Sequence, residues 1–102
     1  MSGLDNTSYT VRTVSATTDT LTQTDFVTVY TNTSAKTVNL PAVASVQPGR
    51  SYTIINTAAG AITVDGSGSE TINGATTLSV TATTGRAQIV SDGTQWWTIT
   101  SS

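Results

Sequence analysis

One stretch decides the fold of this chain: residues 37–99, which read TVNLPAVASVQPGRSYTIINTAAGAITVDGSGSETINGATTLSVTATTGRAQIVSDGTQWWTI. Short runs rich in valine, isoleucine, threonine and aromatic residues alternate there with turn-forming dipeptides. The dipeptides are Pro48-Gly49, Asp65-Gly66, Asn73-Gly74 and Asp92-Gly93. β-Branched runs separated in this way are typical of strands joined by tight turns. The stretch therefore predicts an all-β domain.

Apolar residues in this stretch follow the two-residue period of a strand with one buried face. Core candidates up to residue 80 occupy even-numbered positions: Val38, Leu40, Tyr52, Ile54, Ile62, Val64, Ile72, Leu78 and Val80. After Gly85 they move to odd positions, Ala87, Ile89, Trp97 and Ile99, as an odd-length turn would produce. We expect an antiparallel β-sandwich or small barrel of about eight short strands joined by tight hairpin turns. No repeat of fixed length is evident, so a solenoid is not predicted.

The turns can be assigned from residues that favour turn geometry. Residues 47–50, QPGR, place proline second and glycine third, as in a type II turn. Asn73-Gly74 and Asp92-Gly93 carry residues that accept a positive φ, and we expect a tight turn at each. Asp65-Gly66 is a further hairpin-turn candidate on the same ground.

The chain of 102 residues has the size of a single domain. Residues 1–8 are polar and are predicted to form a flexible N-terminal tail, which leaves residues 9–102 as one all-β domain. Within it, residues 9–14 and 25–30 alternate as strands do, and residues 15–24 are expected to be a loop or an exposed edge.

Hydrophobic residues make up only 36% of the sequence, and the eight glycines bring the apolar share to slightly below that of an average domain. The core is therefore expected to be thin. A thin β-domain gains stability by burying apolar surface against copies of itself. Composition thus favours an oligomer.

The formal net charge is −2, and the four cations are scattered along the chain. A nucleic-acid binder clusters its lysines and arginines to neutralise phosphates, so nucleic acid is not an expected partner. No apolar run is long enough to span a bilayer, and the N-terminus lacks a signal-peptide pattern. We therefore expect synthesis in the cytoplasm and no membrane partner.

The sequence contains no histidine and no cysteine, which excludes nucleophilic triads of the Ser-His and Cys-His kinds. Carboxylate chemistry remains, since a glycosidase needs only two carboxyl groups. The carboxylates considered for such a hydrolase are Asp25, Asp65, Glu70 and Asp92. Asp65 and Asp92 each precede a glycine and are explained as turn residues. We predict that the chain is not an enzyme.

Residues 65–70, DGSGSE, superficially resemble an oxygen-rich calcium loop. They depart from the EF-hand pattern, which needs oxygen ligands at alternating positions, glycine at the sixth and glutamate at the twelfth. A flexible Gly-Ser hairpin tip is the simpler interpretation. No metal site and no cofactor are predicted.

Trp96 and Trp97 are adjacent, so in a strand they point to opposite faces. We assign Trp97 to the core together with Ile99. Trp96 then lies on the opposite face, where a large apolar ring is expected to be covered by a neighbouring subunit.

Several motifs resemble a small β-domain recurrent in virion proteins of tailed bacteriophages. They are Asn39-Leu40-Pro41, the Gly49-Arg50 pair before Tyr52–Asn56, Thr71–Gly74, and the closing Ser91–Trp96. The resemblance covers about two-thirds of the chain. It implies a homotrimer located on the virion in contact with other virion proteins, as a part of a tail fibre, a head fibre or the capsid decoration.

The primary functional prediction is a non-enzymatic virion structural protein, a trimeric capsid decoration or cement protein or a short fibre or knob. Its candidate subunit-interface residues are Trp96, Tyr30 and Phe26. It would act through complementary symmetric surfaces that bury apolar area on assembly.

The alternative is the receptor-binding or glycan-binding tip of a tail fibre. Its loops would be residues 15–24 and 65–70, and its candidate contacts to a host-surface glycan or a protein partner are Tyr52, Asp65 and Glu70. A third class, a hydrolase, would require two carboxylates within catalytic reach.

Overall fold

The computed structural model describes residues 10–101, and in these residues it has nine strands and a short 3-10 helix. The elements are β1 (Thr10–Val14), β2 (Thr18–Thr20), β3 (Asp25–Tyr30), β4 (Lys36–Asn39), η2 (Val43–Ser45), β5 (Ser51–Asn56), β6 (Ile62–Asp65), β7 (Thr77–Val80), β8 (Arg86–Ser91) and β9 (Trp96–Ser101). The all-β prediction is confirmed. The predicted tail, residues 1–8, lies outside the described residues.

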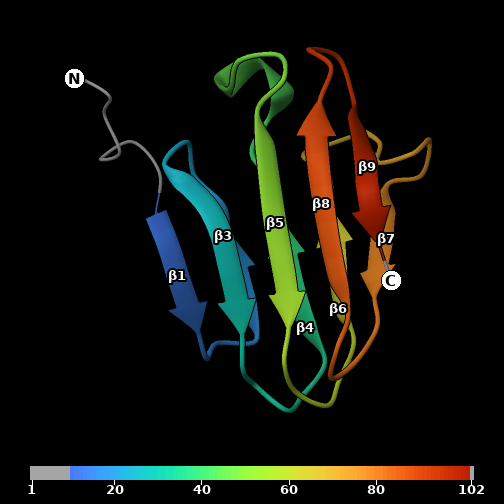
Figure 1. The fold of residues 1–102 in the computed structure, drawn as a ribbon. Helices are drawn as coiled ribbons and strands as arrows, with labels where there is room; N and C mark the ends of the chain where they lie inside the picture. The colour runs from blue at the N-terminus through green and yellow to red at the C-terminus, as the bar shows by residue number, and fades with distance from the viewer. Residues whose placement is uncertain (1–9, 102) are drawn as a thin grey trace.

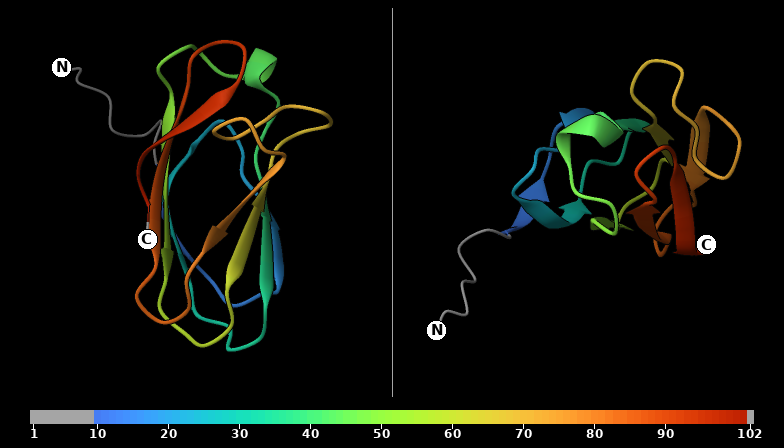
Figure 2. Two further views of the ribbon diagram at one scale, coloured as in Figure 1. Left: turned by 90° about the vertical axis from the view of Figure 1, so that its right-hand side faces the viewer. Right: turned by 90° about the horizontal axis from the view of Figure 1, so that it is seen from above.

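The strands form two sheets that face each other across the core (Figures 1 and 2). Sheet A has the order β1-β3-β5-β8-β9, and sheet B has the order β2-β4-β6-β7. β1 and β2 are therefore the terminal strands of their sheets. In Figure 1 sheet A faces the viewer and sheet B lies behind it.

The chain passes from one sheet to the other after each of the first five strands, so β1 to β6 wind as a two-sheet coil. Strands that are neighbours within this coil run parallel: β1 with β3, β3 with β5, β2 with β4, and β4 with β6. Only the pairs β5–β8, β6–β7 and β8–β9 are antiparallel. The expectation of an antiparallel arrangement is therefore wrong for the first six strands.

The error has a physical cause in the turns. A turn such as Ala59-Gly60 reverses the chain, but it connects β5 in sheet A to β6 in sheet B and not two hydrogen-bonded neighbours. The coil also has no fixed repeat, because the strands of sheet A begin at residues 10, 25 and 51. A solenoid-like winding with turns of unequal length leaves no periodic signal in the sequence.

The core lies between the sheets and consists of side chains that point inward from both. Its buried hydrophobic residues are Val14, Leu21, Tyr30, Val38, Leu40, Val43, Tyr52, Ile54, Ile62, Val64, Ile72, Val80, Ala87, Ile89 and Trp96. Every even-numbered core candidate up to residue 80 is buried, except Leu78, which is half-buried and packs against the core. The two-residue period therefore predicts the inward face of these strands.

The adjacent tryptophans are oriented oppositely to the prediction. Ser91 pairs with Trp96 and Val90 with Trp97 across the β8–β9 hairpin. Directly paired residues face the same side of a sheet, and Ser91 is buried, so Trp96 points inward. Because four residues separate Ser91 from Trp96, the inward positions change from odd to even at this turn. Trp97 and Ile99 are exposed, and their assignment to the core is wrong.

β3 contains a bulge that separates Phe26 from Tyr30. The pairing of β1 with β3 shifts by one residue opposite Phe26, which has no partner in β1. Tyr30 points inward and is fully buried, while Phe26 is exposed. The two rings therefore lie on different faces, although strict alternation over residues 25–30 would place them on the same one, because the extra residue at the bulge breaks the alternation of the strand.

The predicted turn geometry is confirmed at three places. The N–H of Arg50 donates to the carbonyl of Gln47 at 3.0 Å, and Gly49 has φ +90°. Asn73 and Gly74 both have positive φ, and so does Gly93. Before the Asn73-Gly74 turn, Ile72 forms only isolated bridges, to Ala75 and to Trp96.

Lys36 fixes the loops at one end of the coil. Its buried ammonium group donates to the carbonyl oxygens of Asn32, Ser34, Ala59 and Gly60. At Gly60, where φ is +88°, a Cβ atom would lie 2.4 Å from the Ser34 carbonyl oxygen. The β3–β4 and β5–β6 loops are therefore held together by one cation and by a contact that only glycine permits.

The two tryptophans give the first prediction. Trp96→Ala is expected to lower the free energy of unfolding by about 3–5 kcal/mol, because it empties a fully buried site. Trp96→Phe is expected to cost less, since it keeps a ring and the buried indole N–H donates no hydrogen bond within the described residues. Trp97→Ala is expected to cost about 1 kcal/mol or less. Urea unfolding of the three variants measures the ranking, and a larger loss for Trp97→Ala would contradict the facing of β9.

Candidate functional site

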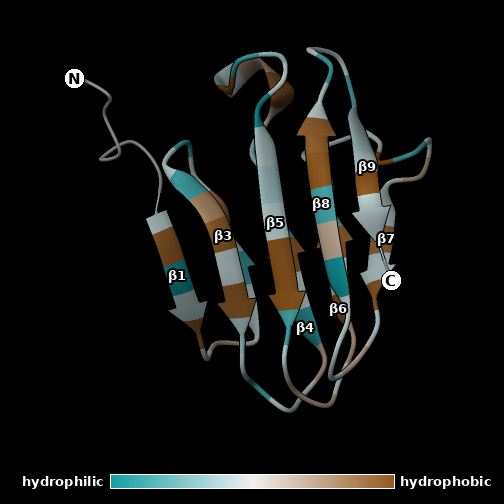
Figure 3. Cartoon of the chain, in the orientation of Figure 1, coloured by the Kyte–Doolittle hydropathy of each residue, from teal (hydrophilic) through white to brown (hydrophobic). Residues whose placement is uncertain are grey.

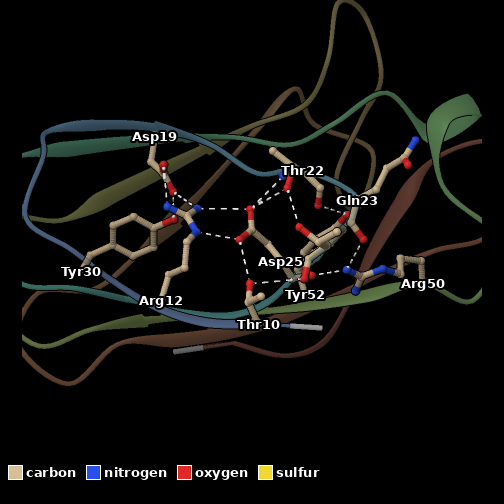
Figure 4. Close-up of polar contacts among 10 residues, drawn as sticks. Thr10, Arg12, Asp19, Thr22, Gln23, Asp25, Tyr30, Arg50 and Tyr52 are labelled. Carbon is tan, nitrogen blue, oxygen red and sulfur yellow. Dashed lines mark hydrogen bonds and ion pairs between the residues drawn. The ribbon is translucent and has the colours of Figure 1, made fainter. Parts of the chain in front are cut away.

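A cluster of charged side chains lies between the sheets at the β1–β2 end (Figure 4). Arg12 donates to Asp25 through Nε (2.6 Å) and Nη2 (3.2 Å), and to Asp19 through Nη2 (2.8 Å) and Nη1 (3.4 Å). The Tyr30 hydroxyl donates to Asp19 Oδ2 at 2.7 Å. One guanidinium therefore connects β1, β2 and β3 across the space between the sheets.

The Asp25 carboxylate is the most buried member of this cluster. It also accepts hydrogen bonds from the backbone N–H of Thr22 at 2.9 Å, the Thr22 hydroxyl at 3.2 Å and the Thr10 hydroxyl at 3.3 Å. Burial raises the pKa of Asp25, but the hydrogen bonds and charge of Arg12 and the bonds from Thr22 outweigh it and hold the pKa below its ordinary value. The cluster thus acts as a charged cross-link between strands.

Arg50 continues the polar contacts toward the core. Its Nη2 donates to the carbonyl of Gln23 at 2.9 Å, and its guanidinium carbon lies 4.2 Å from the centroid of the Tyr52 ring. The Tyr52 hydroxyl donates to the carbonyl of Thr22 at 2.9 Å, and its ring lies 5.9 Å from that of Trp96. Cation, phenol and indole therefore form one stack that leads from the surface into the core.

Two of the three predicted interface residues are not on the surface. Trp96 and Tyr30 are fully buried between the sheets, so their assignment to a subunit interface is wrong. The physical reason is the parity change at the β8–β9 turn for Trp96 and the bulge of β3 for Tyr30. Phe26 is exposed, and its role in an interface stays a prediction.

The predicted glycan contacts do not form one site. Tyr52 is fully buried and cannot stack on a sugar, so this assignment is wrong. The Glu70 carboxylate accepts from the backbone N–H of Val43 at 3.1 and 3.3 Å, which anchors the start of η2. Asp65 is half-buried, ends β6 and belongs to the outer face of sheet B. The structure thus separates the three residues, and it assigns a structural contact to Glu70.

The outer face of sheet A carries several large apolar side chains. Four large hydrophobic residues on this sheet are exposed: Val11 (71%), Phe26 (39%), Trp97 (46%) and Ile99 (55%). Half-buried Val27, Val29, Ile55 and Val90 lie between them on β3, β5 and β8, and the apolar positions of these strands are brown in Figure 3. Polar Thr53, Arg86 and Gln88 share the face with them. Exposed apolar patches with polar neighbours are typical of a protein–protein contact surface.

The outer face of sheet B has the opposite character. Two rows of paired residues cross its four strands: Thr18–Thr37–Thr63–Ser79 and Thr20–Asn39–Asp65–Thr77. Every member of the two rows is polar. Hydroxyl and amide side chains remain well solvated, so sheet B needs no covering protein.

The sequence pattern does not predict the position of some residues that define these surfaces. Trp97 and Val11 carry the exposed apolar face, and an even count of residues in the β8–β9 turn was the signal that could have placed Trp97. The Arg12–Asp19 contact joins residues of two different sheets. The alternation of Arg12 with buried Val14 signals that Arg12 points inward, although it does not identify its partner.

A surface hollow of about 550 Å³ lies beside η2 and is lined by Gln23, Ser45, Val46, Gln47, Pro48, Gly49 and Arg50. Its one charged side chain, Arg50, is engaged by backbone carbonyls and by the Tyr52 ring. Among residues 10–101, no three histidine, cysteine or acidic side chains are grouped so that they could hold a metal ion. The same residues contain no helix long and apolar enough to cross a membrane.

No protein-family model matches this sequence, and a search of curated proteins finds no significant match.

The charged cluster gives a prediction about acid stability. The pKa of Asp25 is depressed in the folded protein. The contribution of its carboxylate to the free energy of unfolding is therefore complete above the pKa of the unfolded chain, about 3.9, and is lost as the pH falls through the pKa of the folded protein. Asp25→Asn is expected to cost about 1–3 kcal/mol at pH 7. The difference from the wild type should shrink as the pH is lowered toward about 2.

Thermal melting between pH 7 and pH 2 measures this convergence. Asp65→Asn is the matched control, since its side chain lies on the outer face of sheet B and makes no contact with Arg12. It should retain the acid-dependent loss of the wild type. Parallel curves for Asp25→Asn and the wild type would show that the Arg12–Asp25 contact does not contribute to stability.

Proposed function

We propose that this protein is a non-enzymatic structural component of a tailed-bacteriophage virion, a capsid decoration protein or a short fibre, that assembles as a homotrimer through the outer face of sheet A. The observation that carries the proposal is the set of four exposed large hydrophobic side chains on this face, in contrast to the polar rows on the outer face of sheet B. The motifs shared with phage virion domains support the location, and the apolar face supports the mode of assembly.

The exposed hydrophobic residues of sheet A lie at its two sides. Val11 and Phe26 form the β1 patch, and Trp97 and Ile99 form the β9 patch. Three strands, β3, β5 and β8, separate the terminal strands β1 and β9. A copy with two different apolar patches can bind one neighbour through each patch. A contact between two different surfaces of identical copies is called heterologous.

Heterologous contacts generate closed rings when the rotation between neighbours closes. We infer that the β1 patch of one copy packs against the β9 patch of the next and that three copies complete the ring. In an isologous dimer, each patch would instead contact the same patch of the other copy. Sheet B then faces outward, where its hydroxyl rows keep the assembly soluble without charge.

The alternative function, glycan binding at the tip of a fibre, is favoured by one observation. Trp97 is an exposed aromatic ring whose indole N–H donates to Asp92 Oδ2 at 2.7 Å. Aromatic faces beside polar groups are suited to sugar rings. Binding of the wild type to a glycan array, lost in Trp97→Ala, would support this function over decoration.

The mode of assembly gives a third prediction. Light scattering of the wild type at micromolar concentration is expected to give the mass of three chains. Val11→Lys and Trp97→Lys should each give monomers, because loss of an aromatic or apolar anchor costs about 2 kcal/mol or more of association free energy, roughly 30-fold in Kd. Thr63→Lys, on the outer face of sheet B, is the matched control and should remain trimeric.

Mixing the two monomeric variants separates the two kinds of interface. In a heterologous ring, Val11→Lys retains an intact β9 patch and Trp97→Lys an intact β1 patch, so the mixture should form heterodimers. A wild type that is monomeric over this concentration range would refute the proposal. Dimers in the wild type and no complex in the mixture would indicate an isologous contact instead.

A further inference from the structure

The side chains that point into the core form ladders across the sheets. In sheet A one ladder runs Arg12–Thr28–Ile54–Ala87, and in sheet B one runs Asp19–Val38–Val64–Leu78. Both ladders are mainly apolar over the inner strands and end in a charged residue on β1 and on β2. Arg12 and Asp19, the two terminal members, bind each other at 2.8 Å.

The end of the coil where this pair lies is otherwise open. Within the described residues 10–101, β1 and β2 have no strand on their outer sides, and both free edges lie at the same end of the two sheets. The neighbouring pairs β1–β3 and β2–β4 are parallel, and after the bulge at Phe26 their residues pair one to one, so the geometry of one more turn of the coil is already defined. Unpaired strand edges of this kind are templates for strands of another chain.

We propose that the Arg12–Asp19 pair is a charged cap on the core, which prevents a second copy of this chain from adding its strands to the β1–β2 edge. An incoming strand pair would place its core residues directly against the guanidinium and the carboxylate. Their burial without solvent would be costly, since the pair is now partly exposed, with 37% of the Arg12 side chain and 15% of the Asp19 side chain accessible.

A further feature of the same edge acts in the same direction. β2, which provides one of the two free edges, is only three residues long. Inward-pointing charges, bulges and short edge strands are the devices by which β-proteins avoid edge-to-edge association. The inference goes beyond the proposed function, because it concerns the strand edges and not the outer face of sheet A.

The test replaces Arg12 and Asp19, the charged ends of the two ladders, with valine, the residue type found at inner positions of the sheet B ladder. Arg12→Val/Asp19→Val is expected to convert the protein into end-to-end polymers, seen as fibres by electron microscopy and as a rise in mass by light scattering. Hydrogen exchange of the amides of β1 and β2 should slow in the polymer. Slowed exchange at these edges distinguishes strand addition from contacts through the outer face of sheet A.

Arg12→Gln/Asp19→Asn is the matched control. It also removes the ion pair, but it leaves a polar end, so it should lose stability without forming polymers. A folded Val/Val variant with the mass of the wild type would overturn the proposal, and so would equal polymerisation of the Gln/Asn control. If the Val/Val variant does not fold, Arg12→Val/Asp19→Val/Asp25→Asn applies the same criteria, because it also removes the buried Asp25 charge that Arg12 neutralises in the wild type.

Discussion

The alternation of β1 to β6 between the two sheets is the constraint on which the rest of the structure depends. Because each strand pairs in parallel with the strand two places later, residues stack in register across the sheets. This register forms rows of paired side chains that are mainly apolar toward the core and polar on the outer face of sheet B. On the outer face of sheet A the rows are mixed, because Val11 and Val27 continue into Thr53 and Gln88. The coil thus converts a lean sequence into one continuous core and one polar face.

A coil of this kind has two ends, and the protein closes them differently. At one end β7, β8 and β9 fold back as antiparallel strands and bring Trp96 over Tyr52. At the other end there is no such covering strand among the described residues, and the last layer of the core is the ion pair of Arg12 with Asp19. A charged layer is tolerated there because it still contacts water, whereas in the middle of the coil it would have to be neutralised or replaced.

The sequence is sufficient to predict the β class, the inward face of most strands and the turn geometry, because strand period and glycine chemistry are local properties. The sequence does not predict which strands become neighbours, because that depends on contacts between distant parts of the chain. Whether a turn joins neighbours in one sheet or strands of opposite sheets depends on how the whole chain packs, so the parallel pairing was not evident. The prediction places Trp96 and Tyr30 on the wrong face for smaller reasons, a turn of even length and a bulge, each of which reverses the facing of the residues beyond it.

The position of Trp96 has a consequence for how the core is completed. The largest buried side chain belongs to β9, the last of the described strands in chain order. β5 has only one neighbour in sheet A until β8 is in place, and the contact between the Tyr52 and Trp96 rings forms only when β9 pairs with β8. The first strands can therefore pair during synthesis, but the core is closed only when β9 is added. A chain that stops before β9 keeps an open core and exposed apolar surface, which makes it prone to aggregation and a substrate for chaperones.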